Sequence, residues 1–241
     1  ARYELVKTMG ASMLVLGPLL AKYGRARIAL PGGCAIGSRP VNYHLDALKE
    51  LGAVINLRNG YIEASAKKLI AANIRFPNIT VTGTENLMMA ASLADGITTL
   101  SNVAMEPEIV DLADMLNSMG AHVEGAGTDK ITIKGVKNLS GTVFDIPADR
   151  IEAGTYLVAA AVTKGNITID GIDPNRLMRV IDKLKNTGAE VEYENNSISL
   201  KMDLESPNPV DITTAPFPEF PTDMQAQFSV INAISNETAN I

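Results

Sequence analysis

An internal repeat of 68 residues constrains the fold of this chain more than any other feature of its sequence. Three matching stretches, at residues 51–55, 119–123 and 187–191, place a glycine at positions 52, 120 and 188. Self-similarity at a fixed period indicates that one structural unit is copied along the chain. We therefore expect the fold to be a series of similar units.

Each copy predicts the same order of elements. An amphipathic helix precedes each of the three glycines; in the third copy Leu177, Val180 and Leu184 give the spacing of one buried face. The glycine after such a helix is the expected left-handed stop. Two short alternating strands follow, and in the first copy Asn59-Gly60 joins them, which is a strong hairpin signal.

A second helix, of a different kind, lies upstream of each amphipathic one. It is apolar nearly all round, so it is expected to be buried. These helices are predicted at residues 11–21, 86–94 and 153–162, and strands are predicted after them at 27–30, 97–100 and 167–169. A fourth copy begins at residues 223–228. The predicted fold class is α/β, built from helix-strand-helix-strand-strand units with buried helices and outer sheets.

Composition excludes several classes of function. The net charge of −6 and the absence of a basic run argue against a nucleic-acid partner. The most apolar run, residues 9–21, is shorter than the roughly 20 residues that cross a bilayer, so no membrane partner is expected. A single cysteine forms no internal disulfide and indicates a cytoplasmic protein. That cysteine and two distant histidines offer no metal-ligand spacing, and no cofactor is expected.

The first copy carries an insertion that its sister copies lack. Its two glycines, Gly24 and Gly52, lie 28 residues apart, whereas the matching pairs in the other copies lie 24 and 23 apart. The extra residues fall within 31–40, between a strand and an amphipathic helix. Because the scaffold forms elsewhere without them, we expect this loop to carry function.

The composition of the loop suits anion chemistry. Its glycines at positions 32, 33 and 37 let backbone amides approach a ligand, and Pro40 is favoured at the first position of a helix whose positive end faces the loop. Arg39 adds a bidentate donor, and the positive field favours the thiolate of Cys34. The alternatives are an inert cysteine and a solvated arginine, but the glycine-rich insertion favours a reactive site.

Several ordered motifs resemble those of the UDP-N-acetylglucosamine 1-carboxyvinyltransferases, members of the enolpyruvyl transferase family. They are residues 31–34 (Pro-Gly-Gly-Cys), 39–41 with His44, 106–111, 149–154 and 220–227. The resemblance implies transfer of the enolpyruvyl group of phosphoenolpyruvate to the 3′-hydroxyl of UDP-N-acetylglucosamine, with release of phosphate. It also implies an inside-out α/β barrel with two lobes of three repeats, and no obligate protein partner.

The same resemblance implies the biological setting. The reaction is the first committed step of peptidoglycan synthesis in the cytoplasm. It supports cell wall biogenesis and, through it, cell shape, the cell cycle and cell division. The antibiotic fosfomycin would act on Cys34.

The resemblance also assigns residues to the site. Cys34 would act as general acid or as the group that adds covalently to phosphoenolpyruvate, Arg39 would contact phosphate, and Asp223 would take the proton of the sugar hydroxyl. The UDP-sugar would contact two segments as well as Asp223: Arg39, Pro40, Val41, Asn42 and Tyr43, then Asn78, Ile79, Thr80 and Val81. The alternative for the second segment is an ordinary strand before a helix.

Asp223 has its own local prediction. Thr222 and Gln225 form a capping-box pattern, which places Asp223 in the first turn of a helix. The alternative is an acid that only complements the helix dipole. Glu106 and Glu108 also stand at a helix start, and they are left out of the predicted site for that reason.

By the same resemblance, residues 1–148 form two repeats of the lobe that carries the Cys34 loop, and residues 149–241 form one repeat and part of another from the second lobe. The chain is then an internal fragment and is expected to be inactive alone. Gly10 stands where the family usually has arginine. The nearest alternative is the sister enzyme that acts on shikimate 3-phosphate. Gly10 also keeps open a non-catalytic protein that binds nucleotide sugars or regulates, and a purely structural repeat protein is a weak third alternative.

Overall fold

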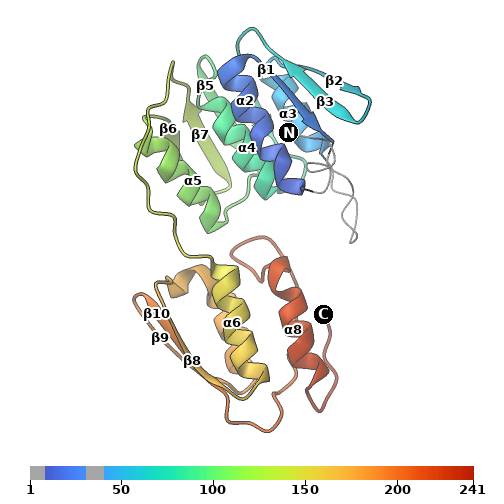
Figure 1. The fold of residues 1–241 in the computed structure, drawn as a ribbon, viewed down its shortest axis with the longest axis vertical. Helices are drawn as coiled ribbons and strands as arrows, with labels where there is room; N and C mark the ends of the chain where they lie inside the picture. The colour runs from blue at the N-terminus through green and yellow to red at the C-terminus, as the bar shows by residue number, and fades with distance from the viewer. Residues whose placement is uncertain (1–8, 31–40) are drawn as a thin grey trace. The chain divides into compact units, whose positions relative to one another are not determined.

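The computed structural model describes residues 9–30 and 41–241. The chain divides into two compact units, Ala1–Phe144 and Asp145–Ile241, and each is described by itself (Figure 1). The sequence placed a lobe boundary nearby, between residues 148 and 149. The assignment of the units to lobes of a larger protein stays a prediction.

Unit 1 contains two repeats and one further strand. The first repeat consists of η1 (Gly10–Val15), α2 (Leu16–Tyr23), β1 (Arg25–Ala29), α3 (Asn42–Glu50), β2 (Val54–Arg58) and β3 (Tyr61–Ser65). After β4 (Asn73–Arg75), the second consists of α4 (Val81–Ala91), β5 (Ile97–Ser101), α5 (Pro107–Ser118), β6 (His122–Glu124) and β7 (Lys130–Lys134). The predicted order of elements is confirmed in both repeats.

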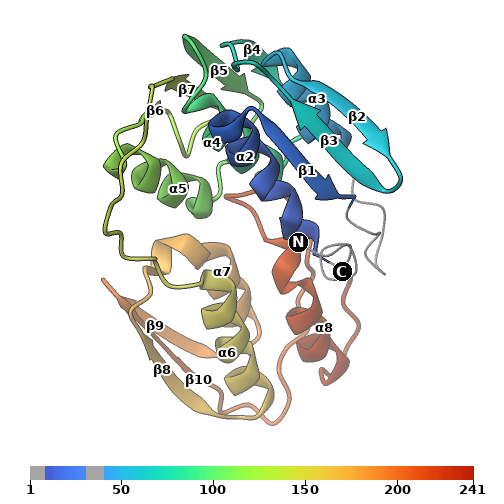
Figure 2. The same ribbon diagram turned by 45° about the horizontal axis from the view of Figure 1, so that its top comes forward.

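Each repeat of unit 1 forms its own sheet. The first has the strand order β1-β3-β2 and the second β4-β5-β7-β6. All pairs are antiparallel except β4 with β5, which is parallel. Strand β4 was not predicted from the sequence. The sheets lie on either side of the packed helices α2 and α4 (Figures 1 and 2). The core between them includes Leu16, Leu48, Ile62, Leu87 and Ile131, all fully buried.

Unit 2 repeats the same plan once. Its elements are α6 (Arg150–Val162), β8 (Asn166–Asp170), η2 (Pro174–Leu177), α7 (Met178–Asn186), β9 (Glu190–Glu194), β10 (Ser197–Lys201), η3 (Thr222–Met224) and α8 (Gln225–Ala233). The sheet order is β8-β10-β9, the order of the first repeat again. A separate core joins α6, α7 and α8 to this sheet, with Phe228 meeting Phe220 edge to face.

The predicted turns form as their residues require. Gly52, Gly120 and Gly188 have φ of 90°, 96° and 91°, the left-handed conformation that ends each amphipathic helix. Asn59 and Gly60 have φ of 50° and 77° in the hairpin between β2 and β3. These local signals therefore set the element boundaries of the repeat.

The first predicted buried helix departs from expectation. Residues 10–15 form a 3₁₀ helix, and the α-helix begins only at Leu16. Pro18 has no amide hydrogen and its ring clashes with the carbonyl four residues earlier, so a regular α-helix does not run back through this turn.

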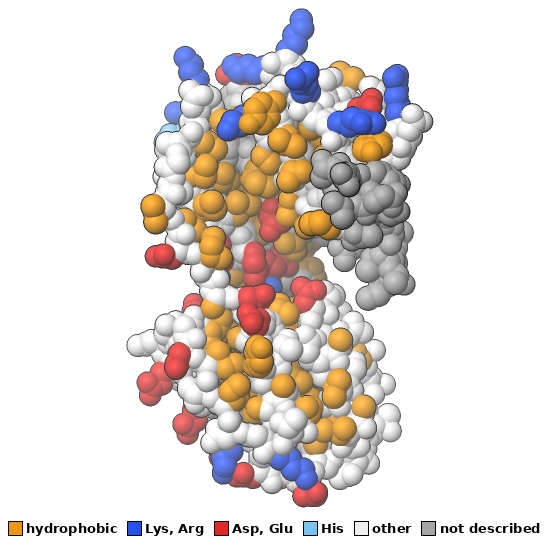
Figure 3. Space-filling view, viewed as in Figure 1, with side chains coloured by type: hydrophobic (Ala, Val, Ile, Leu, Met, Phe, Trp, Pro, Cys, Tyr) orange, Lys and Arg blue, Asp and Glu red, His pale blue; other side chains and the backbone are white. Residues whose placement is uncertain are grey.

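Apolar side chains also face outward from the helices. Figure 3 shows hydrophobic side chains over α2 and α4 in unit 1 and over α6 and α8 in unit 2. Val15, Tyr156 and Val230 are among the exposed ones. The helices are thus apolar on both sides, as the sequence indicates. Among the described residues, no helix has the length and apolar character needed to span a bilayer.

Candidate functional site

The predicted site residues fall into three groups in the structure. Cys34, Arg39 and Pro40 lie outside the described residues. Val41, Asn42 and Tyr43 lie at the start of α3, and Asn78, Ile79, Thr80 and Val81 lie at the start of α4, both in unit 1. Asp223 lies in η3 of unit 2.

The structure brings the two predicted UDP-sugar segments together. The side-chain amide of Asn78 donates a hydrogen bond of 2.6 Å to the hydroxyl of Tyr43, although 35 residues separate them. Val41, Tyr43 and Val81 also pack against the core of unit 1. Asn78 and Ile79 are exposed, so the joined segments present both a polar and an apolar group to solvent.

The start of α4 is held by its own capping residue. The Thr80 hydroxyl accepts a hydrogen bond from the Gly83 amide at 3.2 Å, and its carbonyl accepts one from the Thr84 hydroxyl at 2.7 Å. A side chain at Gly83 would lie 2.4 Å from a Thr80 methyl group, so this cap requires glycine there. The segment itself is not a strand: β4 ends at Arg75 and α4 begins at Val81, so residues 78–80 lie in the connection between them, and their contact with a UDP-sugar stays a prediction.

Two helix starts therefore lie side by side, α3 at Asn42 and α4 at Val81. The start of a helix carries partial positive charge and unpaired amide hydrogens. Paired helix starts suit an anion with two phosphates, and the polar residues beside them can orient a sugar or base.

A buried histidine connects these helices behind the predicted contact residues. The His44 ring is 4% exposed; its Nδ1 lies 3.0 Å from the Asn86 amide nitrogen and its Nε2 lies 3.4 Å from the Thr82 hydroxyl. Asn86 in turn accepts a hydrogen bond of 2.7 Å from the Gly17 amide. Burial lowers the pKa of His44 to about 4, so the ring is neutral at physiological pH. The sequence motif contained His44, but nothing in it indicated Asn86.

A carboxyl group on α4 was also missed. Burial, together with the charges of Glu108 and Glu106, raises the pKa of Glu85 to about 7. Glu106 and Glu108 were set aside as dipole partners at the start of α5. The signal that could have found Glu85 is long-range, because its neighbours follow it by about 20 residues.

Replacing Glu85 with glutamine is expected to stabilise the protein relative to the wild type as pH rises from about 4.5 through 7. The raised pKa means that Glu85 is protonated in both states below about pH 4.5, where its contribution to stability is fully present. That stability is lost as pH rises through 7, because the unfolded chain releases the proton first. Chemical denaturation should show the variant gaining about 1–2 kcal/mol over the wild type between pH 5 and pH 8.5. A difference that does not change with pH would contradict the shift.

Asp223 occupies the predicted first turn, but the predicted capping box is wrong. Pro221 is the capping residue of η3 and makes no side-chain cap, and Gln225 begins α8 instead of closing a box. Residues 222–224 form a 3₁₀ turn, and α8 continues from it. Asp223 is exposed.

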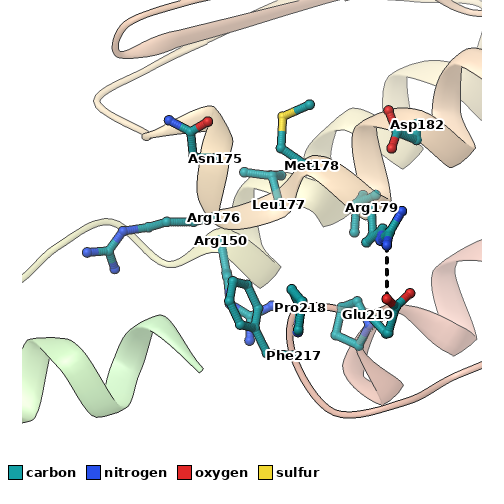
Figure 4. Close-up of a pocket in the computed structure, with 12 residues that line it drawn as sticks. Arg150, Asn175, Arg176, Leu177, Met178, Arg179, Asp182, Phe217, Pro218 and Glu219 are labelled. Carbon is teal, nitrogen blue, oxygen red and sulfur yellow. Dashed lines mark hydrogen bonds and ion pairs between the residues drawn. The ribbon is translucent and has the colours of Figure 1, made fainter. Parts of the chain in front are cut away.

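Unit 2 has a cavity of about 240 Å³ between the start of α6, η2 with α7, and residues 217–221 (Figure 4). Arg179 forms an ion pair of 2.9 Å with Glu219, and the Arg150 guanidinium lies 5.9 Å from the Phe217 ring. Arg176 points away from this pair in the figure. None of the predicted site residues in the described ranges lines the cavity. Residues 9–30 and 41–241 also contain no cluster of side chains that could hold a metal ion.

The comparisons with known proteins identify the family. The protein-family model for EPSP synthase (3-phosphoshikimate 1-carboxyvinyltransferase) matches residues 1–241, so the chain belongs to this family. Within it, the chain is 57% identical over 241 residues to the UDP-N-acetylglucosamine 1-carboxyvinyltransferase of Ruthia magnifica subsp. Calyptogena magnifica. It is also 57% identical over 235 residues to the protein of that name from Halorhodospira halophila. That match covers 98% of this chain and 56% of the Halorhodospira protein. The match to the Ruthia protein covers the whole chain but 58% of the relative.

Solved structures show the same fold at low identity. The enolpyruvyl transferase NikO from Streptomyces tendae superposes with a TM-score of 0.81 at 20% identity, over 97% of this chain and 56% of that one. EPSP synthase from Acinetobacter baumannii superposes with a TM-score of 0.62 at 23% identity, and the match covers 86% of this chain and 49% of that one. The predicted α/β fold of enolpyruvyl transferase type is confirmed.

Proposed function

We propose that the protein containing this chain transfers the enolpyruvyl group of phosphoenolpyruvate to the 3′-hydroxyl of UDP-N-acetylglucosamine and releases phosphate. The observation that carries this proposal is the hydrogen bond between Tyr43 and Asn78, which joins the two segments expected to hold the UDP-sugar. The family and the names of the relatives support the same reaction.

The paired helix starts support the choice of acceptor. The diphosphate of a UDP-sugar carries negative charge that the positive ends of α3 and α4 stabilise. Asn42 and Asn78 are exposed beside them and offer amide groups for hydrogen bonding. Shikimate 3-phosphate carries a single phosphate and no base, so it makes less use of two helix starts.

The catalytic roles follow the sequence prediction. Cys34 would act as general acid or covalent group, Arg39 would bind phosphate, and Asp223 would accept the proton of the sugar hydroxyl. A cysteine five residues before an arginine in a glycine-rich sequence suits either role, because its thiol can donate a proton and its thiolate can attack a carbon atom. Asp223 is exposed and stands at a helix start, so its carboxylate is accessible.

The biological setting is part of the proposal. The reaction would begin peptidoglycan synthesis in the cytoplasm and so serve cell wall biogenesis, cell shape and division, with Cys34 as the group that fosfomycin modifies. The lone cysteine supports a reducing compartment. Because the chain spans 58% of the first relative, we expect it to be inactive without the rest of the enzyme.

Replacing Cys34 with serine is expected to reduce turnover at least about tenfold, because a hydroxyl is a weaker acid and nucleophile than the thiol. The measurement is phosphate release by the full-length protein with both substrates. Binding of UDP-N-acetylglucosamine, measured by calorimetry on the same variant, serves as the control and should change less than twofold. Equal turnover in the two proteins would contradict the role of Cys34.

A binding protein without activity is the second candidate, and Gly10 favours it. This glycine begins η1, where the family usually has an arginine. The same assay separates the candidates, since a binding protein would retain the UDP-sugar and release no phosphate.

A further inference from the structure

One backbone amide determines the protonation of a buried ring near the proposed sugar site. The Gly17 amide can only donate, so the Asn86 atom 2.7 Å away is the side-chain oxygen. The Asn86 nitrogen therefore faces the ring, 3.0 Å from Nδ1 of His44. Because that nitrogen also only donates, Nδ1 must accept and carries no hydrogen. The ring hydrogen is on Nε2, which points to the Thr82 hydroxyl at 3.4 Å.

The packing around this network leaves little alternative to it. Asn86 is fully buried and His44 nearly so. A methyl group on Gly17 would lie 2.4 Å from the Asn86 side-chain oxygen and 2.5 Å from its carbonyl, so the close approach of α2 to α4 depends on glycine. A ring with hydrogens on both nitrogens would direct one of them at the Asn86 amide hydrogens.

The network fixes the position of one helix start relative to the other. His44 follows Tyr43 on α3, and Thr82 follows Val81 on α4. The bonds from the ring therefore join the two elements directly beneath the residues expected to contact the UDP-sugar. The Tyr43–Asn78 bond joins the same elements at the surface.

We propose that His44 is a positioning residue for the UDP-sugar: as a neutral ring with its hydrogen on Nε2, it holds the start of α3 against the start of α4 at the separation that the ligand needs. The inference rests on the proposed function for the identity of the ligand. His44 itself lies under the surface and need not touch the ligand.

Steady-state kinetics on the full-length protein test this role. His44→Phe keeps a planar ring but removes both hydrogen bonds, and it should raise KM for UDP-N-acetylglucosamine about tenfold while KM for phosphoenolpyruvate changes less than twofold. His44→Asn retains an acceptor near the position of Nδ1 and should recover part of the affinity. His122→Phe is the matched control, since His122 is the other histidine and is exposed on β6.

A second measurement reads the ring directly and does not depend on the ligand. ¹⁵N NMR of the histidine side chains should show His44 with a bare Nδ1 and a protonated Nε2. Asn86→Asp replaces the donor with a carboxylate that accepts, so Nδ1 should become protonated. An unchanged Nδ1 signal in that variant would refute the proposed network.

The outcomes separate the two proposals. Wild-type protein that fails to bind UDP-N-acetylglucosamine overturns the proposed function, and the NMR result then still tests the network. Wild-type binding together with an unchanged KM in folded His44 variants overturns the positioning role. Where His44→Phe does not fold, the pair Thr82→Val and Thr82→Ser decides, because Thr82 is exposed and valine removes only the hydroxyl. Weaker binding in the valine variant alone supports the role, and equal binding in both overturns it.

Discussion

Replacing Gly135 with alanine is expected to lower the free energy of unfolding of unit 1 by about 3 kcal/mol or more. The added carbon would lie 1.7 Å from the Ala94 carbonyl oxygen and 2.8 Å from its carbon. The two backbone segments cannot move apart easily, because hydrogen bonds join them on either side of the contact. The Gly135 amide donates to the Gly96 carbonyl at 3.0 Å, and the Val136 amide donates to the Ser92 carbonyl at 2.9 Å. The clash therefore strains the end of α4 and the strand edge of β5 together.

Gly141→Ala is the matched control for this prediction. A side chain at Gly141 would meet no atom within 4 Å, so the same chemical change is made in open space. Urea denaturation of both variants and the wild type should show the Gly141 variant within about 0.5 kcal/mol of the wild type. Equal stability of the two variants would mean that the approach of residue 135 to α4 is looser than the structure shows.

The contribution of His44 to stability is expected to fall by about 3 kcal/mol between pH 7 and pH 4. Burial lowers the pKa of the folded ring from its ordinary value of 6.5 to about 4. Below 6.5 the unfolded chain gains a proton that the folded chain does not, so stability is lost as pH falls toward the folded pKa. Above pH 6.5 both states are neutral and the stability is fully present.

The measurement compares wild type with His44→Gln across this range. Other groups titrate equally in both proteins, so the difference between their free energies of unfolding isolates His44. The wild type should lose its advantage over the variant as pH falls. His122→Gln controls for the loss of an imidazole at an exposed position. A constant difference from pH 7 to pH 4 would show that the folded ring accepts a proton as readily as the unfolded one.

The repeat and its turns were predictable because their signals are local. Glycines in the left-handed conformation and the Asn59-Gly60 hairpin act over a few residues, and helix periodicity acts over a dozen. The first predicted helix lies where the sequence placed it, but its first part is a 3₁₀ helix instead of an α-helix, because Pro18 prevents a regular α-helix there. Strand β4 was missed because three residues are too few for a period to show.

The candidate site was predictable only in part. Sequence motifs named both UDP-sugar segments, but they could not show that Tyr43 bonds to Asn78, 35 residues away. The network around His44 joins residues 42 and 69 positions apart, and no sequence pattern links them. Such contacts depend on how the helices pack, so they become visible only in three dimensions.

The strand order has a consequence for how the protein assembles during synthesis. In the first and third repeats the strand made last lies between the two made earlier, as β3 does between β1 and β2. Neither outer strand has a sheet partner until the chain has grown past residue 65 in the first repeat or residue 201 in the third. Folding on the ribosome should therefore proceed in steps of one whole repeat, and a nascent chain halted within a repeat would leave two strand edges open to aggregation.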